Sequence, residues 1–134
     1  RLLVVADHGM VDSPATARVD VDEVDGMRDG VALLGGEARF RHVYCSAGAV
    51  ADVADTWREV LGDRATVLTR EEAVGRGWFG SVASGVLPRL GDVMVACHDD
   101  TAIVSTRDFP YENTLVGLHG SLTSTEMLIP ILVG

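Results

Sequence analysis

Residues 2–10 read LLVVADHGM, and this stretch decides how the rest of the chain is interpreted. Leu2 to Ala6 is a continuous apolar run, too short for a buried helix, which predicts a central strand covered on both faces. Asp7 and His8 follow at its carboxyl end. Neighbouring side chains on a strand point to opposite faces, so these two can converge only where the chain leaves the strand. Gly9 would permit that departure through backbone angles closed to other residues.

The adjacent Asp and His suggest a metal site but do not establish one. Ligands usually bind at the carboxyl edge of an open α/β sheet. A carboxylate beside an imidazole combines a hard and a borderline ligand, which suits zinc or manganese. The alternative is a loop pair in which Asp7 supports a turn and His8 is solvated. Whether Asp7 and His8 bind a metal therefore depends on further ligands from the rest of the chain.

Composition limits the class of protein and its partners. The 134 residues carry a formal net charge of −9, and 47% of them are hydrophobic. No apolar run approaches the roughly 18 residues of a membrane span. The acidic balance argues against binding to a nucleic-acid backbone, which depends on clustered Lys and Arg. An anionic substrate is still compatible if metal ions supply local positive charge.

The middle of the chain predicts a small helix-on-sheet subdomain. A helix is expected over residues 49–61, ending at Gly62, and a second after the Thr69–Glu72 capping box. Val19–Val24 fits a half-exposed strand or an acidic loop. Further strands are expected over residues 31–34, 38–45, 65–68, 93–97 and 102–105, with turns at Gly35-Gly36 and Asp99-Asp100.

The order of these elements predicts an α/β fold with three parts. Residues 16–110 would form a ferredoxin-like α+β subdomain with helices on one face of a mostly antiparallel sheet. Residues 1–15 and 111–134 would belong to a larger sheet into which this subdomain is inserted. Both ends read as strands of that sheet, so we expect the chain to be part of a longer protein.

A second polar cluster lies near the carboxyl end. His119 is followed by Gly120, which would allow a sharp turn that brings the imidazole close to a ligand. Thr123 and Glu126 form another capping box, opening a short helix that cannot continue through Pro130.

The strand that follows, residues 129–133, resembles Leu2–Ala6 in length and composition. If both strands lie in one sheet, His119 comes within reach of Asp7 and His8.

These two ends together resemble a known family. LLVVADHGM and GLHGSLTSTEMLIPILV (residues 117–133) are similar to the carboxyl-terminal portion of the alkaline phosphatase superfamily. The nearest branch is the nucleotide pyrophosphatase/phosphodiesterase branch, in particular its bacterial members. The similarity covers both ends well, whereas the intervening segment resembles the inserted subdomain of those members only in general character.

The resemblance implies a two-metal site for phosphoryl transfer. Asp7 and His8 match the pair that holds the metal activating the nucleophile, and His119 matches a ligand of the second metal. The expected cofactors are two divalent ions, best fitted by zinc, and the expected substrate is a small phosphate ester or nucleotide. In the family, a Thr or Ser forms a covalent phospho-enzyme that water then cleaves.

Several family features have no counterpart in this chain. The nucleophile, the first metal-binding Asp and an Asp-x-x-x-His pair all precede the Asp-His-Gly strand in the family. Ser121, Thr123, Ser124 and Thr125 are best interpreted as turn and capping residues. We therefore expect no catalytic residue in this chain and no activity from the chain alone. The parent protein would be a metal-dependent phosphoric ester hydrolase.

Two alternative functions remain open from the sequence. Phosphomonoesterases, phosphonate hydrolases, sulfatases and phosphomutases share the same metal scaffold. The chain could instead be a binding or assembly module, in which Asp7, His8 and His119 are incidental.

The other polar and aromatic residues favour structural roles. Trp57 is expected in the core, and packing is preferred over a substrate-facing role for Trp78-Phe79. Cys45 and Cys97 are expected to be free thiols. Solvated faces or turns account for the remaining candidates, which are His42 with Arg39 and Arg41, His98, and the acidic residues Asp20, Asp22, Glu23 and Asp25.

Overall fold

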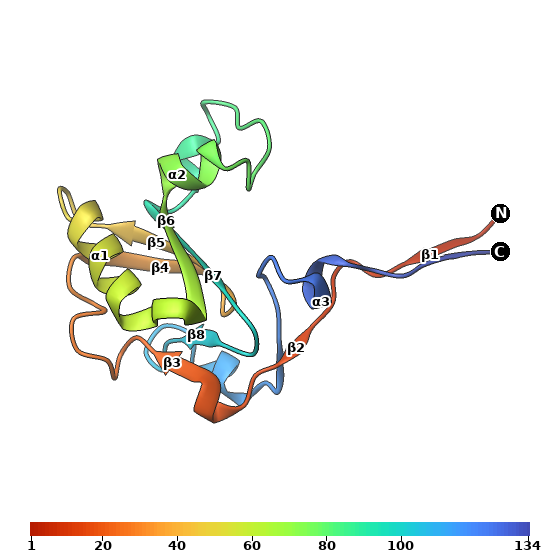
Figure 1. Cartoon of the computed structure of the whole chain (residues 1–134), viewed down its shortest axis with the longest axis horizontal. Helices are drawn as coiled ribbons and strands as arrows, with labels where there is room; N and C mark the ends of the chain where they lie inside the picture. Colours follow the sequence, from red (N-terminus) through yellow and green to blue (C-terminus); the bar gives the residue numbers. More distant parts are fainter.

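A four-stranded antiparallel sheet organises the middle of the chain in the computed structural model, which describes residues 1–134 (Figure 1). The central strand β7 is a continuous apolar run and is buried along its whole length. Its side chains alternate between two hydrophobic clusters, with Val95 in one and Met94 in the other. Across the sheet the strands are β4 (Val31–Glu37), β5 (Phe40–Cys45), β7 (Val93–Cys97) and β6 (Ala65–Thr69).

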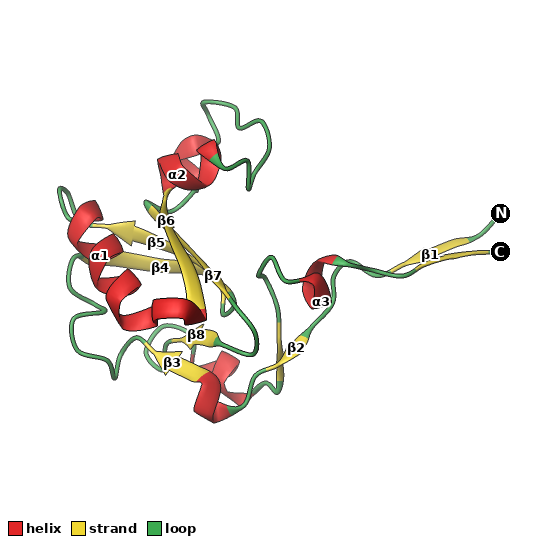
Figure 2. Ribbon diagram, in the orientation of Figure 1, coloured by secondary structure: helices red, strands yellow, loops and turns green.

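Helix α1 (Val50–Leu61) covers one face of this sheet, as predicted (Figure 2). Val53, Trp57 and Leu61 repeat at helical spacing and are all about 1% exposed. The Trp57 indole donates a hydrogen bond to the Met27 carbonyl at 3.1 Å, so the buried ring keeps a polar partner. Gly62 ends the helix with a φ of 55°, which confirms the predicted terminator.

The opposite face is covered by helix α2 (Arg70–Gly75) and the loop that follows it. The predicted capping box is present, since the Thr69 hydroxyl accepts from the Glu72 amide. Trp78 and Phe79 pack against Phe40, with ring centroids 5.7 and 6.2 Å away, which confirms their packing role. The fold class is the predicted α/β class, but helices cover both faces because β7 presents apolar side chains on both.

Two predicted hairpins differ in the structure, although the turn at Asp99-Asp100 is formed, with the Thr101 amide donating to the His98 carbonyl at 3.0 Å. β7 and β8 (Ala102–Val104) do not form a hairpin, because both edges of β7 are already paired with β5 and β6. β8 instead runs parallel to β3 (Arg18–Asp20). The segment 19–24, predicted as a strand or an acidic loop, is strand only as far as Asp20 and turn after it.

The turn between β4 and β5 also lies further along than predicted. β4 continues through Gly35-Gly36 to Glu37, which pairs with Phe40 across a turn at Ala38-Arg39. Gly36 has a φ of 77°, and a Cβ there would lie 2.3 Å from the Phe40 carbonyl oxygen. The glycine therefore allows a close approach between strands rather than a turn.

The two ends of the chain run side by side away from the sheet (Figure 1). β1 (Leu3–Val5) pairs antiparallel with β10 (Ile131–Val133), and β2 (Val11–Asp12) pairs with β9 (Gly117–Leu118). Both predicted terminal strands are formed, and their side chains are exposed in this chain. Their burial within a larger sheet stays a prediction. The remaining helices are α3 (Ser124–Met127) and four short 3-10 helices, Ala15–Ala17, Gly62–Arg64, Leu87–Arg89 and Pro110–Thr114.

None of the helices has the length and apolar character needed to cross a lipid bilayer.

Candidate metal centre

The structure brings His8 and His119 into direct contact from opposite ends of the chain. His8 lies between β1 and β2, and His119 follows β9. Their imidazole rings stack with centroids 3.8 Å apart and planes inclined by 17°. The proximity expected from the sequence is therefore present, and the role of these residues as metal ligands stays a prediction.

Asp7 presents its carboxylate to solvent beside His8. Its side chain is 88% exposed, and its Oδ2 lies 3.6 Å from His8 Nε2. The hydrogen bond from the His8 backbone amide lowers the pKa of Asp7, and the Asp7 amide and the two nearby histidines lower it further. Asp7 is thus ionised at neutral pH and is available as a metal ligand.

The His8 ring is held by its own backbone neighbour. Its Nδ1 lies 2.8 Å from the Gly9 carbonyl oxygen. A proton on Nδ1 satisfies this contact and leaves the Nε2 lone pair free, the arrangement commonly seen in metal-binding histidines.

Gly9 is required for a reason other than the predicted one. Its backbone angles are not in the left-handed region. A Cβ at this position would lie 1.9 Å from the Thr125 carbonyl oxygen in α3. The Gly9 amide also donates to the Glu126 carbonyl at 2.8 Å, so the absence of a side chain lets the two segments touch. At Gly120, by contrast, φ is 122°, consistent with the sharp turn expected after His119.

Asp7, His8 and His119 do not complete a metal site by themselves. No group of three or more His, Cys, Asp or Glu side chains in this structure is arranged to hold a metal ion. The donor types nevertheless fit a zinc-like ion, which is bound by imidazole and carboxylate in catalytic sites. The chain therefore presents compatible donors at one place without a closed coordination sphere.

A buried ion pair that was not predicted from the sequence lies behind these candidate metal ligands. Arg39 is 0% exposed and Glu126 is 2% exposed. The Arg39 Nε and Nη2 groups donate to the two carboxylate oxygens of Glu126 at 2.8 and 3.0 Å. The prediction that Arg39 belongs to a solvated face is wrong, because each of its three nitrogens donates to a buried oxygen.

Glu126 does more than the predicted capping box required. Its carboxylate accepts from the Ser121 amide at 3.0 Å and from the Thr123 hydroxyl. Helix α3 does begin after Thr123, but the Thr123 side chain bonds to the carboxylate and not to the backbone. Burial raises the pKa of Glu126, and the Arg39 hydrogen bond, followed by those from Thr123 and Ser121, outweighs burial and lowers it.

Arg41 forms a second ion pair, in which the arginine is buried and Glu112 is partly buried. It is 0% exposed, contacts Glu112, donates to the Ile103 carbonyl at 2.8 Å and lies 4.7 Å from the Phe109 ring centroid. The strand alternation contained the signal for this burial. Arg39, just before β5, and Arg41 within it alternate in register with Val43, which is 0% exposed.

The other two histidines have structural partners. His42 accepts a hydrogen bond from the Gly91 amide at 3.2 Å, and burial lowers its pKa. In His98, Nε2 lies 2.8 Å from the Thr66 hydroxyl and Nδ1 lies 2.8 Å from the Asp63 carbonyl. Both nitrogens of His98 are thus engaged by protein groups.

Asp22 departs from the predicted solvated acidic face. Its side chain is 8% exposed and pairs with Arg28 at 2.7 Å. Burial alone would raise the pKa of Asp22, but hydrogen bonds from the Arg107 amide, the Ser105 hydroxyl and Arg28 lower it to about 2. This carboxylate therefore fixes the loop after β3 against the segment after β8.

Cys45 and Cys97 are free thiols, as predicted. Burial raises the pKa of Cys45 to about 11 and that of Cys97 to about 12, so neither is a ready nucleophile.

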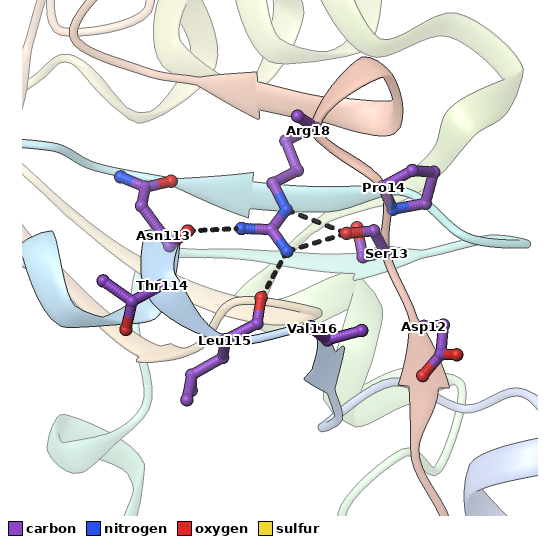
Figure 3. Close-up of a pocket in the computed structure, with 9 residues that line it drawn as sticks. Asp12, Ser13, Pro14, Arg18, Asn113, Thr114, Leu115 and Val116 are labelled. Atoms are coloured by element: carbon purple, nitrogen blue, oxygen red, sulfur yellow. Dashed lines mark hydrogen bonds between the residues drawn. The ribbon is translucent and has the colours of Figure 1, made fainter.

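A surface cavity of about 560 Å³ lies where the terminal segments join the sheet, and Arg18 crosses it (Figure 3). Arg18 donates to the carbonyl oxygens of Ser13, Asn113 and Leu115 at distances of 2.5–3.1 Å. The guanidinium thus joins both terminal segments to β3 and is largely satisfied by backbone groups.

Comparison with known proteins places the chain in a family. A family model of type I phosphodiesterases and nucleotide pyrophosphatases matches residues 1–122. The chain belongs to this family. A search of curated proteins found no match.

Solved structures share the fold. The chain superimposes on human ectonucleotide pyrophosphatase/phosphodiesterase 5 with a TM-score of 0.73 and 18% identity, covering 98% of this chain and 32% of that one. For the murine protein, an inactive variant in complex with AMP, the TM-score is 0.72 and the identity 18%, and the match covers 97% of this chain and 32% of that one. For phosphonoacetate hydrolase from Sinorhizobium meliloti, in complex with phosphonoformate, the TM-score is 0.62 and the identity 20%, and the match covers 97% of this chain and 35% of that one. The chain thus spans about a third of the length of these structures.

Proposed function

We propose that this chain supplies part of the active site of a two-metal phosphodiesterase or nucleotide pyrophosphatase. The observation that carries the proposal is the contact between His8 and His119, formed by the two ends of a chain that belongs to the phosphodiesterase family. A binding module would have no need to bring these two imidazoles together beside an ionised carboxylate.

Asp7 and His8 would hold one divalent ion, and His119 would be a ligand of the other. The separation of 3.6 Å between Asp7 Oδ2 and His8 Nε2 supports the first assignment. Two donors bound at about 2.1 Å to a tetrahedral zinc ion lie about 3.4 Å apart, so one ion can reach both atoms after a small adjustment. When bound, such ions would offset the charge on a phosphate ester and stabilise both the attacking oxygen of the nucleophile and the leaving oxygen of the ester.

This chain's own residues would hold metal ions rather than react with substrate. The attacking hydroxyl of a Thr or Ser and the remaining ligands would come from elsewhere in the full-length protein, so the isolated chain would be inactive. Attack on a diester would form a covalent phospho-enzyme that keeps one ester group and loses the other as an alcohol, or as a phosphate group from a pyrophosphate. Water would then release the phosphate monoester and restore the hydroxyl. Residues 1–15 and 111–134 would belong to the catalytic domain, and residues 16–110 would be its insertion.

A nucleotide ester is the substrate class that we favour. A solved relative of similar fold contains AMP, and the family is named for diester and pyrophosphate cleavage. Phosphonate hydrolysis is the second candidate, because another structure of the same fold is a phosphonoacetate hydrolase.

Substrate preference tests the proposed activity. The full-length protein would be assayed with bis(p-nitrophenyl) phosphate, p-nitrophenyl phosphate and phosphonoacetate, before and after treatment with a chelator. We expect preference for the diester and loss of activity on chelation, restored by zinc. A preference for the monoester or the phosphonate would reassign the substrate class, and activity indifferent to chelation would contradict metal dependence.

A further inference from the structure

We propose that the Arg39–Glu126 ion pair fixes the positions of the candidate metal ligands His8 and His119, which come from the two ends of the chain. This inference rests on the proposed function and adds residues that touch no metal. It follows from the hydrogen bonds that converge on one buried carboxylate.

The first contact fixes the His119 side. The Ser121 amide, two residues after His119, donates to Glu126 Oε1 at 3.0 Å. The Ser121 hydroxyl donates to the Cys97 carbonyl at 2.6 Å, and Ser121 itself is 2% exposed. The loop carrying His119 is therefore tied to Glu126 and to the end of strand β7.

The second contact fixes the His8 side through the same residue. The Gly9 amide donates to the backbone carbonyl of Glu126 at 2.8 Å. The Gly9 carbonyl in turn lies 2.8 Å from His8 Nδ1 and orients that ring. Displacement of Glu126 would therefore shift the supports of both histidines at once.

Arg39 connects Glu126 to the sheet. Its backbone carbonyl accepts from the Cys97 amide at 3.0 Å, and its Nη1 donates to the Thr101 carbonyl at 2.6 Å. The two-point contact with Glu126 fixes the carboxylate in position and in plane. A lysine would keep the charge but lose the paired geometry.

The Arg41–Glu112 pair provides a matched control two residues along the chain from Arg39. Arg41 is 0% and Glu112 17% exposed, so the arginine is buried and its partner is partly buried, but Glu112 lies in the 3-10 helix Pro110–Thr114. Among its hydrogen bonds, none reaches Gly9, Ser121 or either candidate metal ligand. Breaking it should reduce stability without moving the metal donors.

The experiment compares zinc affinity in full-length Glu126→Gln, Arg39→Lys and Glu112→Gln proteins. Affinity for Zn²⁺ would be measured by competition with a chromophoric chelator, at a temperature where circular dichroism shows each protein folded. Residues that orient metal ligands typically change metal affinity by about 10–100-fold when replaced. We expect losses of that size for Glu126→Gln, a smaller loss for Arg39→Lys and no change for Glu112→Gln.

Equal zinc affinity in Glu126→Gln and Glu112→Gln proteins would overturn the inference. If Glu126→Gln does not fold, Arg39→Lys decides the question: unchanged affinity overturns the inference, and reduced affinity supports it. His119→Ala separates this failure from failure of the proposed function. If that variant also binds zinc like the unmodified protein, the metal assignment itself is wrong.

Discussion

Gly9, near the start of the chain, contacts helix α3, near its end, only in the folded protein. The space for its missing side chain is occupied by the Thr125 carbonyl oxygen, 1.9 Å from an ideal Cβ. Any larger residue would push β2 away from α3, and with it the peptide whose carbonyl orients His8. At this position the backbone contact, and not a special backbone angle, demands glycine.

Gly9→Ala should destabilise the protein by at least about 2 kcal/mol, because the opposing atom belongs to the backbone and cannot rotate away. Denaturant unfolding monitored by circular dichroism measures this loss. Gly75→Ala is the matched control, since a Cβ on this last residue of α2 would meet nothing within 4 Å. The control should be neutral or stabilising by up to about 1 kcal/mol. Similar losses from both substitutions would contradict the account of Gly9.

Asp22 predicts a pH dependence of stability. Its folded pKa of about 2 lies below the unfolded value of 3.8, so its contribution is present above pH 4 and is lost as pH falls through 2. Asp22→Asn should therefore cost about 1–2 kcal/mol near pH 7.

Denaturant unfolding of both proteins between pH 7 and pH 2 tests this contribution, and the difference should narrow below pH 4. Asp25→Asn in the same loop is the control and should change little, because Asp25 is exposed. A difference for Asp22→Asn that stays constant with pH would show that the carboxylate charge is not responsible.

At the scale of elements, local signals in the sequence were sufficient for the helices and for most strands. The glycine after α1 and the Thr69 capping box act within a few residues, so their effects can be read from the sequence. The partners of β8 could not be read in this way. β7 has both edges paired by strands distant in sequence, so β8 pairs with β3 instead.

The candidate site was predictable only in part. Asp7, His8 and His119 stood out by residue type and by the strands and glycines beside them. Arg39 and Glu126 did not, because each looks like an ordinary surface or capping residue until the two segments meet. The alternation of Arg39 and Arg41 with Val43 along the chain was the one signal that could have placed both arginines inside.

The capping box of α2 gives a prediction at this scale. Thr69→Ala removes the hydroxyl that accepts from the Glu72 amide and should cost about 1 kcal/mol. Ser124→Ala in α3 is the control, because Ser124 is exposed at the first position of its helix. Thermal unfolding should show a lower midpoint for Thr69→Ala than for Ser124→Ala, and equal midpoints would argue against a stabilising cap.

At the scale of the whole molecule, the four-stranded sheet and the terminal ribbon should differ in stability. β7 is fully buried with partners on both edges, whereas β1 and β10 are exposed and pair only with each other. An isolated two-stranded ribbon is marginally stable in water. The chain therefore combines a stable unit with a segment that depends on further contacts.

Amide hydrogen exchange of the 134-residue chain tests this difference. Amides of β5 and β7 should exchange only through global unfolding, while those of β1 and β10 should exchange orders of magnitude faster. In the full-length protein, the β1 and β10 amides should become protected if the ribbon lies within a larger sheet. Equal protection of the ribbon and the central sheet in the 134-residue chain would contradict the account.

The most direct test of the central claim is the metal content of the full-length protein, measured by elemental analysis under metal-replete conditions. The unmodified protein should carry about two equivalents of a divalent metal. The Asp7→Ala/His8→Ala double variant and the His119→Ala variant should each lose about one equivalent, because they act on different ions. Unchanged metal content in both variants, or no bound metal in the unmodified protein, would contradict a two-metal site at the meeting point of the two termini.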